Sequence, residues 1–105
     1  MVEFAFETMI IEWRGPAPFH FAPIPDEYVE AVRRAARIAS YGWGVVPVEA
    51  TIGSVVFTTS LFPKDGGYLL PIKVAARTKA KVTVGDTIAV TMTIQAPAPG
   101  TRFER

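Results

Sequence analysis

Apolar and polar residues alternate between Val2 and Trp13. Val2, Phe4, Phe6, Thr8 and Ile10 fall on one side of an extended chain, and Glu3, Ala5, Glu7, Met9 and Ile11 fall on the other. Side chains of a β-strand point alternately to its two faces, so this pattern is typical of a strand with one buried face. We predict such a strand over residues 2–13. Two prolines at 16 and 18 then end it, and a short aromatic strand over residues 19–22 follows.

A helical pattern occupies residues 25–40. Pro25 suits the first helical position, and the two acidic residues after it place negative charge where the helix dipole favours it. An apolar stripe at helical spacing consists of Tyr28, Val29, Val32, Ala35, Ala36 and Ala39. Three arginines, at 33, 34 and 37, lie opposite, and Glu30 is spaced to pair with Arg34. We predict one amphipathic helix that covers a sheet.

Strand patterns dominate the rest of the chain, and they predict strands over residues 45–52, 55–62, 68–76 and 87–95. Gly53-Ser54 predicts a two-residue hairpin turn. The Lys-Asp-Gly-Gly segment at 64–67 predicts a second reversal, because Asp and Gly tolerate positive φ. A tight turn is expected at residues 82–87, where the carboxylate of Asp86 can accept hydrogen bonds from nearby amides.

Two prolines inside predicted strands, Pro47 and Pro71, indicate sheet edges or the bulges that bend a sheet into a barrel. We therefore predict a mainly β protein: a small closed or split antiparallel β-barrel of about six strands with one amphipathic α-helix. A chain of 105 residues can bury one core but not two. We expect a single barrel domain over residues 1–95 and a Pro-Ala-rich tail over residues 96–105.

The composition narrows the class of protein. Half of the residues are apolar, a fifth are charged, and the formal net charge is +1, which argues against disorder and weakly against nucleic acid as a partner. The absence of cysteine fits a reducing compartment. The sequence shows neither a basic leader before an apolar block nor an apolar run of membrane-spanning length. We expect a soluble, cytoplasmic protein without membrane association.

Several segments, taken together in their order and spacing, resemble a small bacterial family known as domain of unknown function 1905. The matching positions are the opening strand at 4–13, Phe21 with Pro23-Ile24-Pro25, residues 42–48, Thr51-Ile52-Gly53, residues 60–63, residues 67–73, Arg77 and Val84-Gly85-Asp86. The resemblance implies a compact split β-barrel with one helix, distantly similar in topology to swapped-hairpin transcription factors and antitoxins. It implies no established activity. Some members carry a further bacteriocin-protection-type domain, and this chain resembles the stand-alone form.

The sequence shows no metal-ligand cluster, nucleophile-and-base pair or phosphate loop, so we assign no catalytic residue, metal or cofactor. His20 is the single histidine, and we expect it at the surface or in a hydrogen bond, because metal sites recruit several ligands. Ser60 and Lys64 are four residues apart, whereas a helical Ser-Lys nucleophile pair has a spacing of three. Pro63 also opposes a helix there, so we interpret Ser60 as the end of a strand.

Four residues are the candidate ligand-binding set: Trp43, Tyr68, Lys73 and Arg77. Trp43, between two glycines, either lines a pocket or plugs one end of the barrel. Lys73 and Arg77 belong to a basic segment that also contains Lys79 and Lys81, and such side chains bind phosphate or carboxylate when they gather. If all four candidates line one cleft, ligand binding is favoured; if they are scattered, a structural role is favoured.

These observations favour a non-catalytic module that binds an unknown small ligand or a protein partner, as a monomer or a weak homodimer. The first alternative is a nucleic-acid-binding protein, prompted by the basic segment at 73–81 and by the topological similarity to swapped-hairpin transcription factors and antitoxins that the resemblance implies. The second is an enzyme with an unfamiliar arrangement of carboxylates, Lys or Tyr. Nucleic-acid binding requires a salt-dependent affinity. An enzyme requires two titratable side chains that converge in one pocket.

Overall fold

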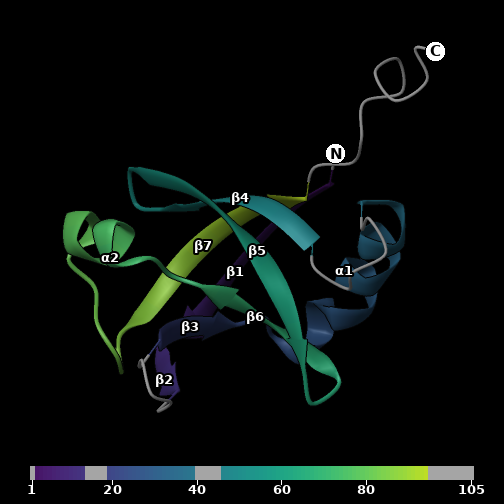
Figure 1. The fold of residues 1–105 in the computed structure, drawn as a ribbon, viewed down its shortest axis with the longest axis horizontal. Coiled ribbons are helices and arrows are strands. Elements are labelled where there is room, and N and C mark those ends of the chain that lie inside the picture. Colours follow the sequence, from purple (N-terminus) through teal and green to yellow (C-terminus); the bar gives the residue numbers. More distant parts are fainter. Residues whose placement is uncertain (1, 14–18, 40–45, 95–105) are drawn as a thin grey trace.

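The structure is a computed structural model that describes residues 2–13, 19–39 and 46–94. Its elements in chain order are β1 (Val2–Met9), β2 (Ile11–Trp13), β3 (Phe19–Pro23), α1 (Asp26–Ala39), β4 (Val46–Ile52), β5 (Val55–Lys64), β6 (Gly67–Pro71), α2 (Val74–Ala80) and β7 (Thr87–Ile94). The predicted mainly β fold is confirmed. Within the described residues, seven strands form one antiparallel sheet curled into a half-barrel. The two helices lie at opposite ends of it (Figure 1).

The sheet curls because its two edge strands are consecutive in the chain. The strand order is β1-β7-β4-β5-β6-β3-β2, and the strand predicted over residues 2–13 is split at Ile10 into the two edges. Ile10 is buried, and its backbone bonds to the turn before β7: its N–H donates to the carbonyl of Asp86, and its carbonyl accepts from Gly85, both at 2.9 Å. The hydroxyl of Thr8 donates to the carbonyl of Pro23 at 2.6 Å and so links β1 to β3.

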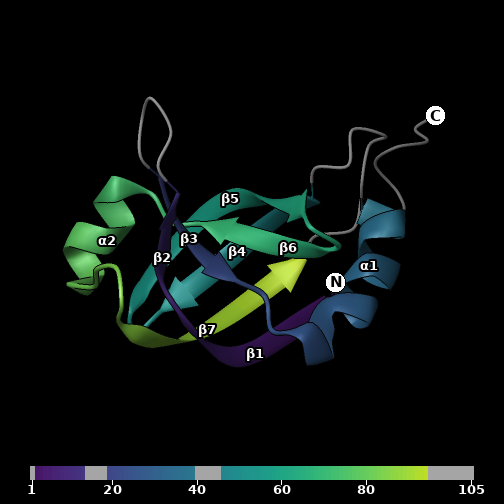
Figure 2. The same ribbon diagram turned by 90° about the horizontal axis from the view of Figure 1, so that it is seen from below.

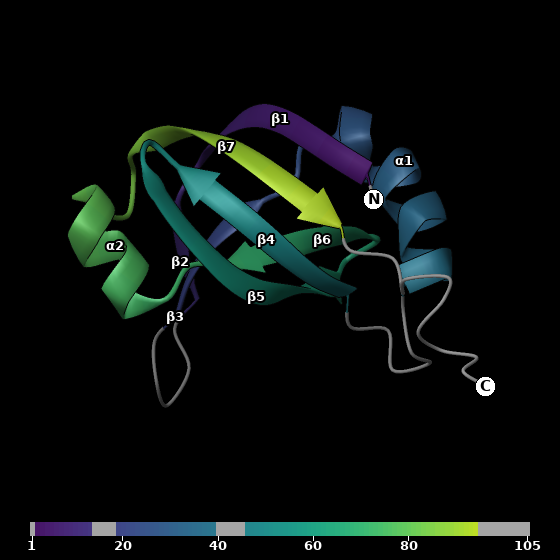
Figure 3. The ribbon, with the colours of Figure 1, turned by 90° about the horizontal axis from the view of Figure 1, so that it is seen from above.

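Strand β5 belongs to both halves of the curled sheet. Its residues 55–61 pair with β4 and its residues 62–64 pair with β6. Figure 3 shows β1, β7, β4 and β5 side by side, and Figure 2 shows β6, β3 and β2 as the other half. Alternate positions face inward and supply most of the core: Phe4, Phe6, Val46, Val48, Ala50, Ile52, Leu61, Leu70, Ile88, Val90, Met92 and Ile94.

The three predicted turns are confirmed. Gly53 has a φ of +62° between the paired ends of β4 and β5. Asp65 and Gly66 have φ values of +52° and +79° in the turn between β5 and β6. Before β7, Gly85 has a φ of +94°, and the carboxylate of Asp86 accepts from the N–H of Thr83 at 2.9 Å. These turns were predictable because short-range chemistry determines them.

Helix α1 begins and ends within one residue of its predicted bounds and covers one end of the sheet. The side chains of Val29, Val32, Ala35 and Ala36 are buried, as the helical stripe predicts. The ring of Tyr28 packs against Phe4 and Phe6, with ring centroids 6.2 and 5.9 Å apart. The apolar face of the helix therefore closes the core at this end.

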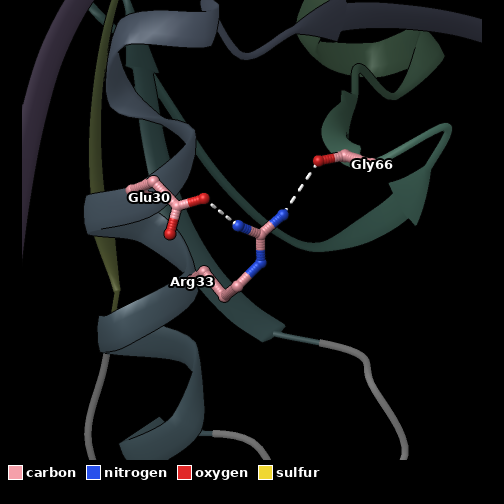
Figure 4. A network of polar contacts seen from close by, with 3 residues as sticks. All are labelled: Glu30, Arg33 and Gly66. Atoms are coloured by element: carbon pink, nitrogen blue, oxygen red, sulfur yellow. Dashed lines mark hydrogen bonds and ion pairs between the residues drawn. The ribbon is translucent and has the colours of Figure 1, made fainter.

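The polar side of α1 corrects one prediction. Glu30 pairs with Arg33, three residues along, and not with Arg34 as predicted (Figure 4). The other terminal nitrogen of Arg33 donates to the carbonyl of Gly66 at 2.9 Å. The β5–β6 turn, in which Gly66 has a φ of +79°, lies beside the helix, and Arg33 contacts both partners from this position (Figure 4). Arg33 thus ties the helix to the turn.

A second helix replaces the end of a predicted strand. The strand expected over residues 68–76 ends at Pro71, and residues 74–80 form α2. The sequence of this segment is rich in Ala, Arg and Lys, which are strong helix formers. Ala76 is buried, and Ala80 packs against the core four residues later. Lys81 then ends the helix in the left-handed conformation, with a φ of +59°.

Candidate functional site

The four predicted ligand-binding residues do not share one cleft. Lys73 and Arg77 line a hollow beside α2. Tyr68 lines another hollow, beside α1 at the opposite end of the sheet (Figure 1). Trp43 lies outside the described residues. We name the first the α2 hollow and the second the α1 hollow, and the two candidate cations are the only members of the predicted set that the described residues bring together.

The α2 hollow has a volume of about 370 Å³, which is within the range of small-molecule sites. It lies between the start of β3, the end of β6 and the first turn of α2, and it is lined by Phe19, His20, Pro71, Ile72, Lys73, Val74 and Arg77. Its wall is mainly apolar. A backbone hydrogen bond from the N–H of Ile72 to the carbonyl of His20, at 3.0 Å, fixes the two strands at its base. The pocket is therefore built on paired strands.

Arg77 is held in place at the rim of the α2 hollow. Its Nε donates to the carbonyl of Ile72 at 3.4 Å, and its Nη1 lies 3.4 Å from Nε2 of His20. Both distances are long for hydrogen bonds, so these contacts orient the Arg77 side chain without using up its capacity to donate hydrogen bonds. Within the described residues, Nη2 has no hydrogen-bond partner. A guanidinium in this position keeps donors for a planar anion.

His20 contributes the other nitrogen of this contact. It shares a face of β3 with the buried Ala22 and is half-buried, so the expected hydrogen-bonding role fits better than an open surface position. A guanidinium only donates, so Nε2 of His20 can take part in this contact only as the acceptor. Nδ1 is buried and finds no partner within the described part of the chain. The guanidinium of Arg77 beside this imidazole supplies hydrogen-bond donors that suit a bound anion.

The charges around the α2 hollow are not balanced locally. Among the described residues, no carboxylate lies within 4.0 Å of the charged groups of Lys73 or Arg77. Glu12, the cross-strand neighbour of His20, is exposed and is not part of the lining. The exposed Lys79 and Lys81 do not line the hollow either. Two cations therefore share an apolar hollow with the imidazole of His20.

The α1 hollow differs in charge. It has a volume of about 390 Å³, and it is lined by Pro23, Ile24, Asp26, Val29, Glu30, Lys64, Asp65, Gly66, Gly67, Tyr68 and Leu69. Glu30 is paired with Arg33, and the Nζ of Lys64 lies 3.7 Å from Asp65. Tyr68 also serves the fold, because its carbonyl accepts from the N–H of Ile24 at 3.0 Å. Most of the charged side chains that line the α1 hollow are therefore already in ion pairs.

The polar contact expected of His20 is present, but its partner, Arg77, was not predicted. The residues are 57 positions apart and meet through the pairing of β3 with β6 and the start of α2. One signal in the sequence pointed to a half-buried His20: in a strand it shares a face with Ala22, two residues along. Ser60 lies in a strand, but not at its end as interpreted, because β5 continues to Lys64. Within the described residues, no group of three or more His, Asp or Glu side chains could hold a metal ion, and no helix is long and apolar enough to cross a membrane.

The fold and this hollow define a class: small, curled antiparallel half-barrels with a helix at each end. The family model described as a domain of unknown function, DUF1905, matches residues 6–92. The match covers most of the chain, and the protein belongs to this family. No curated protein matched the chain.

Proposed function

We propose that this protein is a non-catalytic binding module that holds a small oxyanion, a carboxylate or a phosphate, in the α2 hollow. One observation carries the proposal: Lys73 and Arg77, one helical turn apart, line an apolar hollow without a nearby carboxylate among the described residues. Arg77 supplies planar donors and Lys73 supplies a mobile point charge. An anion that displaces water from this hollow gains charge-assisted hydrogen bonds in apolar surroundings.

The proposal is tested by titrating the full chain with inorganic phosphate and with acetate, followed by amide chemical shifts at constant ionic strength. The shifts should concentrate at residues 19–20 and 72–77. A hydrogen bond to a charged group contributes about 1.5–3 kcal/mol, so R77Q should weaken binding about tenfold or more. K79Q removes the same charge from the same helix but lies outside the hollow, and it should change the affinity by less than about twofold.

Removing a nearby negative charge provides a second control. E12Q should strengthen anion binding modestly, because Glu12 lies opposite His20 in the β2–β3 pair. Equal losses in R77Q and K79Q would mean that diffuse surface charge attracts the anion, and would remove the α2 hollow as the site. Shifts that scatter over the whole surface would have the same consequence.

A further inference from the structure

Beside the α2 hollow, the outer face of the sheet carries four aromatic rings in mutual contact. Trp13, Phe19, Phe21 and Phe62 form this aromatic patch. Centroid distances are 6.1 Å for Trp13–Phe21, 6.2 Å for Phe19–Phe21, 5.4 Å for Phe21–Phe62 and 6.5 Å for Trp13–Phe62. The strands that carry them, β2, β3 and β5, belong to one half of the sheet, with β6 between β3 and β5 (Figure 2). The patch faces away from the barrel core.

Two rings of the patch are presented to solvent on paired strands. Phe21 is only 2% exposed, although it faces outward, because the other rings cover it. Phe19 is 56% exposed and Trp13 is 46% exposed, and the two residues are directly opposite each other in the β2–β3 pair. Exposed aromatic surface of this extent is unfavourable in water unless a ligand covers it.

Phe19 connects the aromatic patch to the α2 hollow. It belongs to the patch and also lines the hollow with Lys73 and Arg77. At the other side of the patch, the Nζ of Lys64 lies 5.0 Å from the centroid of the Trp13 ring. Exposed aromatic rings are thus flanked by cations on both sides. Flat rings and cations in alternation match a ligand that joins a flat base to a phosphate.

We propose that the oxyanion is the phosphate of a nucleotide, with the phosphate in the α2 hollow and the base stacked on Phe19 beside Trp13. This inference rests on the proposed function and names its ligand class. Stacking on aromatic side chains is tolerant of base identity, because every base has a π-face. The ligand is either a free nucleotide or a nucleotide within a single strand, since both present the same base and phosphate.

Calorimetric titration of the full chain with four probes tests the inference: inorganic phosphate, AMP, adenosine and the single strand (dA)6. One stacked base contributes roughly 5- to 150-fold in affinity, so AMP should bind more tightly than phosphate by a factor in this range. F19A should abolish the advantage of AMP over phosphate, so that the two ligands bind to this variant with equal affinity. V56A, which truncates a 58% exposed side chain on the other half of the sheet, should change neither.

Fluorescence locates the base. In a W43F background the emission comes from Trp13, and AMP should quench it while inorganic phosphate should not. Tighter binding of (dA)6 than of AMP, with an affinity that falls with salt, assigns the site to single strands; equal affinities assign it to free nucleotides. Equal affinities of AMP and phosphate, with F19A without effect, would overturn the inference and leave the oxyanion site standing. Failure of phosphate and AMP alike would overturn both.

Discussion

The substitution L61A tests whether the curled sheet encloses one continuous core. Leu61 has an exposed fraction of 0% and lies opposite Val46, at the last position where β5 pairs with β4. From the next residue onward, β5 pairs with β6. The side chain therefore fills the bend through which the two halves of the sheet share their interior. A cavity at this position should weaken the packing between the two halves of the sheet.

The magnitude follows from the atoms removed. Leu to Ala deletes three carbon atoms, and each buried CH₂ contributes about 0.8 kcal/mol, which gives about 2.5 kcal/mol before any cavity forms. The cavity adds to this loss, because paired strands relax little, and buried Leu-to-Ala substitutions cost about 2–5 kcal/mol. We expect a loss of about 3–4 kcal/mol. Domains of this size are stable by about 5–15 kcal/mol, so L61A should remain folded but markedly less stable.

Urea unfolding followed by circular dichroism measures the effect as a shift in midpoint at unchanged slope. V56A is the matched control, because Val56 lies on the same strand and is 58% exposed. It should cost less than about 0.5 kcal/mol. A loss below about 1 kcal/mol in L61A, or a loss equal to that of V56A, would refute the shared interior. The bend would then be a surface feature between two separate layers.

Two further substitutions test the polar tie and the turn. R33A should cost about 1 kcal/mol in the free energy of unfolding, because it removes the hydrogen bond to Gly66 and the exposed ion pair with Glu30 (Figure 4). R34A is the control and should cost almost nothing. Equal losses of the two variants in urea unfolding would contradict the role of Arg33 in tying the helix to the turn. G85A should cost about 1–2 kcal/mol by thermal unfolding, because Gly85 has a φ of +94° and an added Cβ meets nothing within 4 Å, so backbone strain is the whole effect. G67A, at a glycine without positive φ, is its control, and an unchanged melting temperature in G85A would contradict the strained conformation.

The sequence predicts well those features that neighbouring residues determine. The period of two in β1, β4 and β7 and the stripe of α1 gave the elements and their buried faces. The turns at Gly53, Asp65 and Gly85 followed from the conformations that Gly and Asp permit. The split at Ile10 was not predicted, although the apolar positions change side there, from 2, 4 and 6 before it to 9, 11 and 13 around it. Pairing with β7 on one side and with β3 on the other decides where the strand divides.

The sequence named Lys73 and Arg77 as candidates, but the error at α2 hid how closely the two residues lie. Lys73 and Arg77 are four residues apart, so they lie on the same side of a strand as well as of a helix. In a strand, four residues span about 13 Å, too far for two side chains to share one small anion. On a helix, the same spacing brings them to about 6 Å. The assignment of residues 72–76 to a strand therefore separated the two cations that α2 brings to one hollow. Their spacing and the helix-forming composition of residues 74–80 were equally compatible with a helix.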